Sequence, residues 1–224
     1  MENKNEISIR QTELNNKGIQ LTTFSQLIEF AEVVRKSGLA PKNFTTNESI
    51  VIAVQFGLEL GLAPMQSLQG VAVINGMPSL YGDSAKALCL ADPSCVWIKE
   101  TTRGKMEDGT YTAICKSLRV GHEEPLETEF SIEDAKRAGL WVGNNPDAKQ
   151  RLSTWYKYPK RMLMFRARGF NLRDNFTDIM KGFKTVEEVS DYEDLGNGTK
   201  VSYKKKQQRT SSSSLPPSDF EDVD

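Results

Sequence analysis

The chain has 224 residues, of which 38% are hydrophobic and 26% are charged, with a formal net charge of −1. This length allows one domain of about 150 to 170 residues with a full core. No apolar run approaches the length needed to cross a bilayer, and the polar start MENKNEISIR is unlike a signal peptide. We therefore expect a cytoplasmic protein without a membrane segment.

The cysteine and histidine content argues against several kinds of catalytic site. The three cysteines lack C-x-x-C spacing and have apolar neighbours, so they predict buried free thiols: Cys89, Cys95 and Cys115. His122, the single histidine, lies in the polar turn GHEEP. Neither a zinc site nor a Ser-His-Asp triad is recognisable around it.

Two N-terminal helices are predicted by caps and apolar periodicity. Thr22 or Thr23 caps the first, which ends near Gly38, and Thr46 precedes the second, which stops at Gly61. Pro64 then begins a short helical turn. The inward positions of these two helices are Leu27, Phe30, Ala31, Val34, Ile50, Val51, Val54 and Leu58.

The middle of the chain predicts strands around isolated helices. In VAVINGMPSLY, Asn75–Gly76 is typical of a type I′ hairpin turn. Asp83 is placed to cap a helix through Leu90, and Ser131 with Asp134 forms a start similar to a capping box. Three strands are expected at Cys95–Thr102, Tyr111–Val120 and Leu126–Phe130. The turn GKMEDG joins the first two, and its Asp108–Gly109 repeats the hairpin-turn chemistry.

This order indicates an α+β fold: two helices, a β-hairpin, a helix, a three-stranded antiparallel sheet and a long basic helix. We expect residues 1–20 to be disordered, residues 21–184 to form the folded domain, and residues 185–224 to form an acidic, mostly disordered tail. Within that tail, Val186–Leu195 predicts a frayed acidic helix.

Positive charge is concentrated between Lys149 and Lys181. That stretch contains nine basic and two acidic residues, a net charge of +7, so the rest of the chain sums to −8. Such asymmetry in a neutral chain indicates a surface that binds a polyanion. Pro159 suits the first turn of a helix. Its apolar stripe is predicted to be Met162, Phe165, Gly169, Leu172 and Phe176.

Helical geometry arranges the basic side chains beside that stripe. At about 100° per residue, Arg161 and Arg168 fall on one flank, and Arg166 and Arg173 fall on the other. Guanidinium groups bind phosphate oxygens through two parallel hydrogen bonds. Just upstream, three aromatic residues are candidates for stacking on unpaired bases: Trp155, Tyr156 and Tyr158.

For any single arginine, the alternative is an ion pair with a carboxylate elsewhere in the fold. A fold that buries these guanidinium groups against carboxylates would contradict a DNA-binding role for them.

Three segments carry a family resemblance. GLELGLAPMQSLQGVAVINGMPSLYGD, together with EDAKRAGLW and YPKRMLMFRARGFNLRDNF, resembles the RecT group of phage single-strand annealing proteins, related to Redβ and Erf. The similarity covers residues 22–188. It implies a phage- or prophage-encoded protein of the bacterial cytoplasm that anneals complementary DNA strands without ATP, as a ring or helical filament. The absence of a G-x-x-x-x-G-K-[ST] loop fits ATP independence, and nothing in the sequence indicates magnesium.

The resemblance implies a basic groove in which single-stranded DNA and the annealed duplex intermediate bind. Carried over onto this sequence, with the flanking residues above, the DNA-binding candidates are Lys86, Trp155, Tyr156, Lys157, Tyr158, Lys160, Arg161, Arg166, Arg168 and Arg173. An exonuclease or a single-strand-binding protein is the implied partner. The ending SDFEDVD is similar to acidic tips that recruit partners, with a solubilising role as the alternative.

Three other functions compete with annealing. The first is a sequence-tolerant single-strand-binding module that does not anneal. The second is a metal-dependent nuclease, which needs converging carboxylates. Its candidates are Asp83, Glu133, Asp174 and Asp178. The third is a phage structural protein, for which one concentrated basic stripe is an odd feature.

Overall fold

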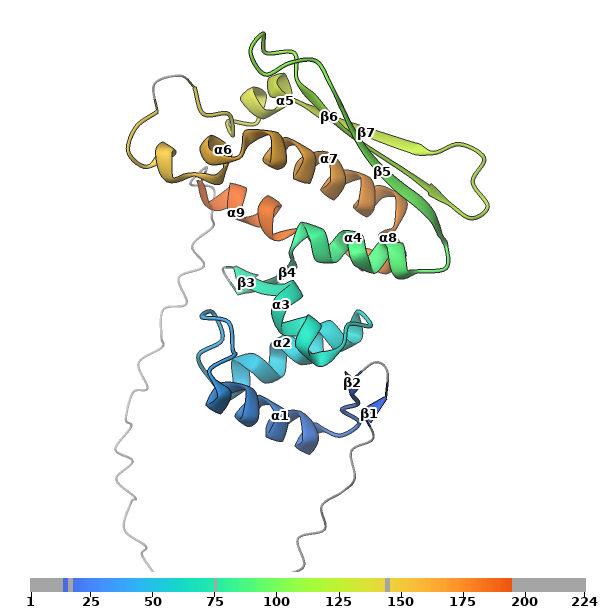
Figure 1. Ribbon diagram of the computed structural model, residues 1–224, viewed down its shortest axis with the longest axis vertical. Coiled ribbons are helices and arrows are strands. Elements are labelled where there is room, and N and C mark those ends of the chain that lie inside the picture. The colour runs from blue at the N-terminus through green and yellow to red at the C-terminus, as the bar shows by residue number, and fades with distance from the viewer. Residues whose placement is uncertain (1–13, 16–17, 75, 144–145, 195–224) are drawn as a thin grey trace, which may run out of the picture.

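The structure is a computed structural model that describes residues 14–15, 18–74, 76–143 and 146–194 (Figure 1). The helices are α1 (Phe24–Ser37), α2 (Asn47–Glu59), α3 (Pro64–Gly70), α4 (Gly82–Ala91), α5 (Ile132–Arg137), α6 (Thr154–Lys157), α7 (Pro159–Asn175), α8 (Thr177–Met180) and α9 (Val186–Asp194), with a 3₁₀ turn, η1 (Gln150–Leu152). The strands form three antiparallel sheets: β1 (Leu14–Asn15) with β2 (Gly18–Ile19); β3 (Val71–Ile74) with β4 (Met77–Leu80); and β5 (Cys95–Arg103), β6 (Thr112–Arg119) and β7 (Leu126–Ser131). This confirms the predicted α+β class.

The first two helices begin where their caps predict. The Thr23 hydroxyl accepts the backbone N–H of Gln26, whose side chain in turn accepts the backbone N–H of Thr23. Gly38 ends α1 with a φ of +73°, a left-handed conformation that glycine adopts without strain. Thr46 caps α2 through the N–H of Ser49. The two helices bury a shared core formed mainly by Leu27, Ala31, Val34, Ile50, Val51, Val54 and Leu68.

The β3–β4 hairpin is confirmed, with Gly76 at a φ of +76°; position 75 lies outside the described residues. The predicted role of Asp83 as a cap is wrong. Tyr81 is the N-cap of α4, and its side chain makes no capping hydrogen bond. The N–H of Gly82 is instead satisfied by the carboxylate of Glu187, which α9 brings across the chain. Asp83 lies in the first turn and turns its carboxylate toward arginines of α7.

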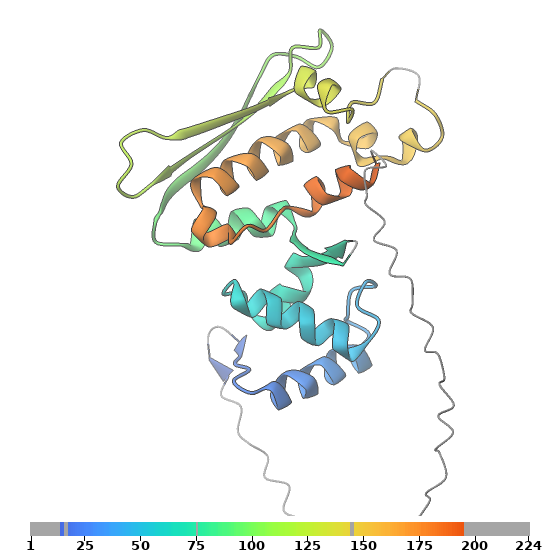
Figure 2. The ribbon, with the colours of Figure 1, turned by 180° about the vertical axis from the view of Figure 1, so that it is seen from behind.

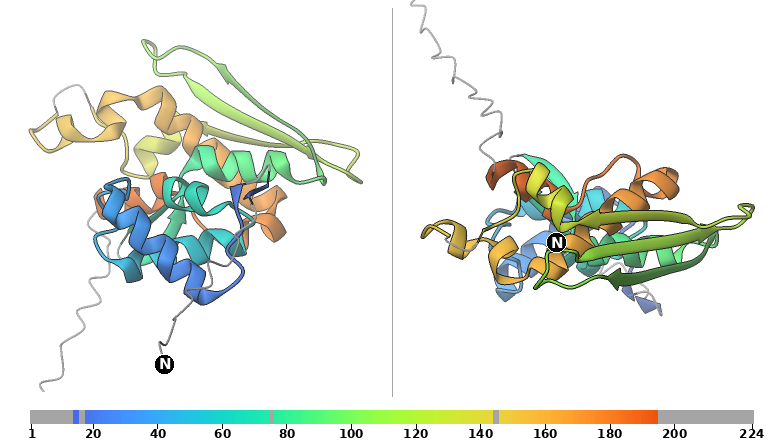
Figure 3. Two further views of the ribbon diagram at one scale, coloured as in Figure 1. Left: turned by 60° about the horizontal axis from the view of Figure 1, so that its bottom comes forward. Right: turned by 90° about the horizontal axis from the view of Figure 1, so that it is seen from above.

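The three-stranded sheet covers one side of α7 (Figures 1 and 3). β6 is the central strand, and its residues Ala113 and Cys115 are buried in the core. The predicted turn between β5 and β6 is confirmed by Gly109, which has a φ of +77°. Ser131 and Asp134 form the expected capping box of α5. The whole predicted stripe of α7 is buried: Met162, Phe165, Gly169, Leu172 and Phe176.

The chain returns after α7 to pack α9 on the opposite side of that helix from the sheet (Figure 2). Just before α9, Thr185 forms a parallel bridge with Leu80, the last residue of β4. The segment that leads into α9 therefore pairs with the β3–β4 hairpin. The folded part therefore continues through α9, past the boundary at residue 184 that composition predicts. Residues 195–224 lie outside the described residues. At the other end, the β1–β2 pair lies within the stretch expected to be disordered.

The three cysteines are free, and burial raises the pKa of Cys89 and Cys115 to about 12. Across the described ranges, no single helix has the length and apolar character of a membrane span; α2 and α3 meet that test together, with a bend of 104° between them.

Candidate nucleic-acid interface

The basic helix α7 lies between two layers. It contacts β6 and β7 on one side and α4 and α9 on the other (Figure 1). The second layer covers positions that the sequence pattern assigns to the flanks of the apolar stripe. Arg166 and Arg168 are buried for this reason, with 7% and 6% of their surfaces exposed.

Trp155 does not offer its ring for base stacking, contrary to the prediction. Trp155 is 2% exposed, and its ring packs against Phe130 in the core beneath the sheet. Its indole Nε1 donates a hydrogen bond of 2.6 Å to Asp191 of α9. Because a buried indole N–H needs an acceptor, Trp155 acts as a core anchor.

Arg166 is also removed from solvent by α9. Its Nε donates to Asp191 at 2.8 Å, and its Nη1 lies 3.8 Å from a carboxylate oxygen of Glu188. Arg173, seven residues after Arg166 on the same flank of α7, lies 2.9 Å from the same Glu188 and keeps 28% of its side chain exposed. The two guanidinium groups lie over the ring of Phe170, at 5.8 and 5.4 Å from its centroid.

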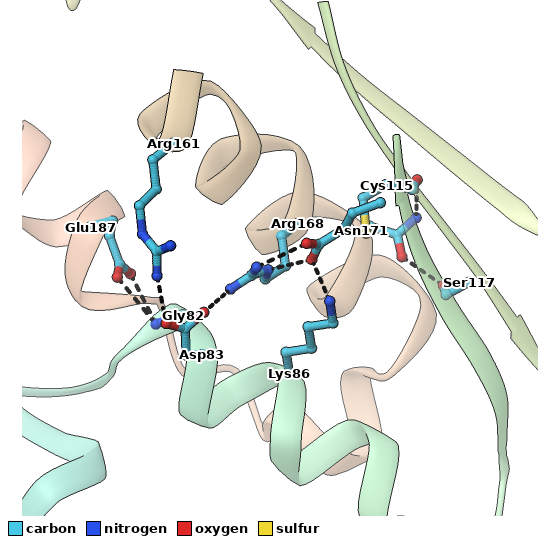
Figure 4. A network of polar contacts seen from close by, with 10 residues as sticks. Gly82, Asp83, Lys86, Cys115, Ser117, Arg161, Arg168, Asn171 and Glu187 are labelled. Carbon is cyan, nitrogen blue, oxygen red and sulfur yellow. Dashed lines mark hydrogen bonds and ion pairs between the residues drawn. The ribbon is translucent and has the colours of Figure 1, made fainter. Parts of the chain in front are cut away.

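Arg168 is the centre of a second network (Figure 4). Its Nε and Nη2 donate to the two carboxylate oxygens of Glu100 on β5, at 2.6 and 3.0 Å. Its Nη1 donates to Asp83 at 2.6 Å. Lys86 lies 3.0 Å from Glu100 in the same network, with 25% of its side chain exposed. In this conformation Arg166 and Arg168 therefore face carboxylates and not the surface, contrary to the expected orientation, and Lys86 is engaged by a carboxylate as well.

Electrostatics keep this second network ionised. Burial alone raises the pKa of Glu100, but the hydrogen bonds and charge of Arg168, with a contribution from Lys86, outweigh burial and hold the pKa below its ordinary value. For Asp83 the same balance between burial and Arg168 gives a lowered pKa. The carboxylates and the guanidinium are thus charged together at neutral pH.

The remaining candidates lie on the surface at the junction of α6 and α7. Tyr156, Lys157, Tyr158, Lys160 and Arg161 are exposed, and we call them the cationic rim. Tyr156 and Tyr158 are 46% and 62% exposed. Ser153 caps α6, and Pro159 begins α7 two residues after α6 ends, so the turn between the helices projects these side chains outward.

Arg161 connects the rim to a cleft. Its guanidinium pairs with Asp83 at 2.8 Å, although 61% of its side chain remains exposed. It also lies 4.7 Å from the centroid of the Phe165 ring. The adjoining cleft, of about 690 Å³, is lined by residues of α3, α4, α7 and α9, among them Gln66, Tyr81, Ser84 and Glu187. Burial raises the pKa of the Glu187 carboxyl group.

Sequence reasoning missed the acidic partners. Glu100 lies on a strand 68 positions before Arg168, and no local pattern joins them. Glu188 did carry a signal: Thr185-x-x-Glu188 has the spacing of a capping box, and the Thr185 N–H donates to that carboxylate at 3.3 Å. Asn171 was also missed. Its amide bonds Ser117, the Cys115 and Leu126 carbonyls and the Thr128 hydroxyl, fixing α7 to β6 and β7.

Three carboxylates of the nuclease alternative have separate basic partners. Asp83 pairs with Arg161 and Arg168, Asp178 pairs with Arg119, and Glu133 pairs with Lys136. In the part of the chain that the structure describes, no group of three or more histidine, cysteine, aspartate or glutamate side chains is arranged to hold a metal ion.

Comparisons with protein-family models, with curated proteins and with solved structures find no match to this chain.

Proposed function

We propose that this protein binds single-stranded DNA without sequence preference and anneals complementary strands without ATP. The observation that carries the binding step is the cationic rim, where two tyrosine rings and three cations are exposed within six residues. Cations neutralise phosphates and release counterions, while aromatic rings stack on bases of any identity. The annealing step rests on the resemblance of the chain to the RecT group.

Annealing needs electrostatics and no bond chemistry. Two strands repel each other through their phosphates, and bound cations remove that barrier. Each matched base-pair step then contributes about 1.4 kcal/mol of stacking, so a few matched steps outweigh a modest strain that the protein imposes. Sequence is read by the two strands, and the protein contacts the backbone.

Self-association belongs to this proposal, because several protomers on one strand raise the effective concentration of sites. The inner faces of α1 and α2 form the core of the chain itself and are not available for it. Other apolar side chains remain on the surface of these helices, including Phe24 at 67% and Ile52 at 60% exposure. If these side chains form a contiguous patch, it offers a surface for contact between protomers. Light scattering with and without an oligonucleotide measures the assembly.

The decisive experiment replaces Lys157 and Lys160 with alanine and measures binding to fluorescent oligonucleotides across a salt series. We expect weaker binding to every sequence, and a slope of log K against log salt that falls by about 1.4, since each phosphate contact on a single strand contributes about 0.7. The matched control is Lys36→Ala with Lys42→Ala, two exposed lysines of the helical N-terminal part. Equal losses in both variants would remove the rim from the proposal.

A strand-annealing assay separates annealing from strand protection. Complementary naked oligonucleotides are mixed with the protein in the absence of nucleotide triphosphate, and duplex formation is followed by energy transfer. Acceleration over the spontaneous rate supports annealing, whereas retention of both strands without acceleration supports a strand-binding module. Incubation of labelled DNA with magnesium in the same series tests the nuclease alternative, for which shortened strands are the expected product.

A further inference from the structure

The acidic helix α9 directs three carboxylates at hydrogen-bond donors of the body. Glu187, Glu188 and Asp191 lie on one side of the helix, where each meets a donor group. Glu188 and Asp191 are each 1% exposed. Buried carboxylates in such numbers are found where cationic or N–H partners compensate for their lost hydration.

The donors that α9 covers belong to the types that bind phosphate. Glu187 accepts from the N–H of Gly82 at the start of α4, at 3.0 Å. Glu188 and Asp191 together engage the guanidinium groups of Arg166 and Arg173. The N-terminus of a helix and arginine guanidinium groups are recurrent phosphate-binding elements in proteins. The carboxylates of α9 thus lie where nucleic-acid phosphates would meet these donors.

The position of α9 in the chain allows it to leave without dismantling the sheet. It is the last element that the structure describes, and it lies on the side of α7 away from β5, β6 and β7 (Figure 2). Its main apolar anchor is Val189, which is 5% exposed. The bridge between Thr185 and Leu80 holds its N-terminal end to the β3–β4 hairpin.

We propose that α9 is an intramolecular acidic cover that competes with nucleic-acid phosphates for Arg166 and Arg173, and that a bound single strand displaces it. This inference rests on the proposed function and adds regulation to it. Because an unpaired buried charge is costly, the arginines exchange one anion for another instead of opening without a partner. Because α9 must be displaced before the strand reaches these arginines, its competition lowers the apparent affinity for DNA.

The test weakens the cover in the full-length chain. Glu188→Gln with Asp191→Asn keeps the shape of both side chains and removes their charge. We expect this variant to bind single-stranded DNA at least about threefold more tightly than the unsubstituted protein does. Its binding should also depend more steeply on salt, because two further arginines contact phosphates. The matched control is Glu124→Gln with Asp174→Asn, two exposed positions that give the same change in net charge. An equal gain in the control would overturn the proposal.

Hydrogen exchange of the unsubstituted protein gives a second measurement that does not depend on a variant folding well. Backbone amides of α9 are expected to exchange faster when the protein is saturated with an oligonucleotide. If DNA binds and these amides keep or increase their protection, the cover is wrong and the proposed function stands. If the protein binds no oligonucleotide at low salt, both proposals fall.

Discussion

Arg168 and Glu100 form a two-point ion pair that fastens the middle of α7 to β5, with both charges largely removed from solvent. Arg161, one heptad earlier, shares the acidic partner Asp83 with Arg168 and remains mostly exposed. Two arginines that the sequence places on one flank thus have different environments. Their substitution separates stability from binding.

Arg168→Ala is expected to lower the free energy of unfolding by about 3–5 kcal/mol, because it leaves Glu100 buried with only Lys86 as a cationic partner. For a folded part of this size, the melting temperature falls on the order of 10 °C. Arg161→Ala is expected to cost less than about 1 kcal/mol, as exposed ion pairs do, and to weaken binding to single-stranded DNA. Thermal melting and anisotropy titrations of both variants decide the matter; equal melting temperatures would contradict the buried role of Arg168.

Acid should weaken the same network. The pKa of Glu100 lies below its ordinary value of 4.5 when the chain is folded, so its ionisation stabilises the fold above that value and the contribution is lost as the pH falls through the lowered pKa. The unsubstituted protein should melt at a higher temperature than Glu100→Gln at pH 7, and the difference should shrink below about pH 4.5. A difference that stays constant down to pH 3 would show that the charge of Glu100 does not contribute.

Stacking should depend on the two exposed tyrosines and not on their buried neighbour. Tyr156→Ala and Tyr158→Ala are each expected to reduce the free energy of single-strand binding by about 1–3 kcal/mol, with little change in the melting temperature. Trp155→Phe should lower the melting temperature and leave single-strand binding almost unchanged. It removes the indole N–H that Asp191 accepts, and we expect the buried ring to make no contact with the strand. Strand binding that depends on Trp155 alone would place the stacking surface elsewhere.

Asn171 supplies a purely structural prediction. Its side chain is fully buried and bonds two carbonyls and two hydroxyls of the sheet. Asn171→Leu has a similar volume but leaves those groups without their partner, so we expect a loss of at least about 2–3 kcal/mol in stability. Urea denaturation measures it. Unchanged stability with leucine would mean that water or a backbone shift provides hydrogen-bond partners for those carbonyls and hydroxyls.

Local rules predicted the elements of this fold. The caps at Thr23, Thr46 and Ser131 and the turns at Gly76 and Gly109 lie within a few residues of the features that mark them, so one sequence is enough to find them. The boundaries of the three predicted strands differ from those of β5, β6 and β7 by at most one residue.

The candidate site was predicted only in part, because exposure depends on the second layer that packs against a helix. The 3.6-residue period locates the buried stripe of α7. It does not predict whether other elements also cover the flanks of that stripe. Arg166 is covered by α9, which follows α7 in the chain, and Arg168 is held by β5 and α4, which precede it. The acidic composition of residues 186–194 favoured a solvated tail. Composition alone does not show that carboxylates of this segment pair with guanidinium groups of α7.

The bridge from Thr185 to Leu80 has a consequence for biosynthesis. The N–H of Leu80 donates to the carbonyl of Lys184, a residue made more than a hundred positions later. At the usual pace of translation, roughly 5 to 20 seconds separate the emergence of the two. During that interval the first two helices can already pack against each other. The β3–β4 hairpin meanwhile has no hydrogen-bond acceptor from the chain for the N–H of Leu80. Chaperones that shield strand edges are thus expected to engage this polypeptide between the emergence of the hairpin and that of residue 184, at the junction between its two halves.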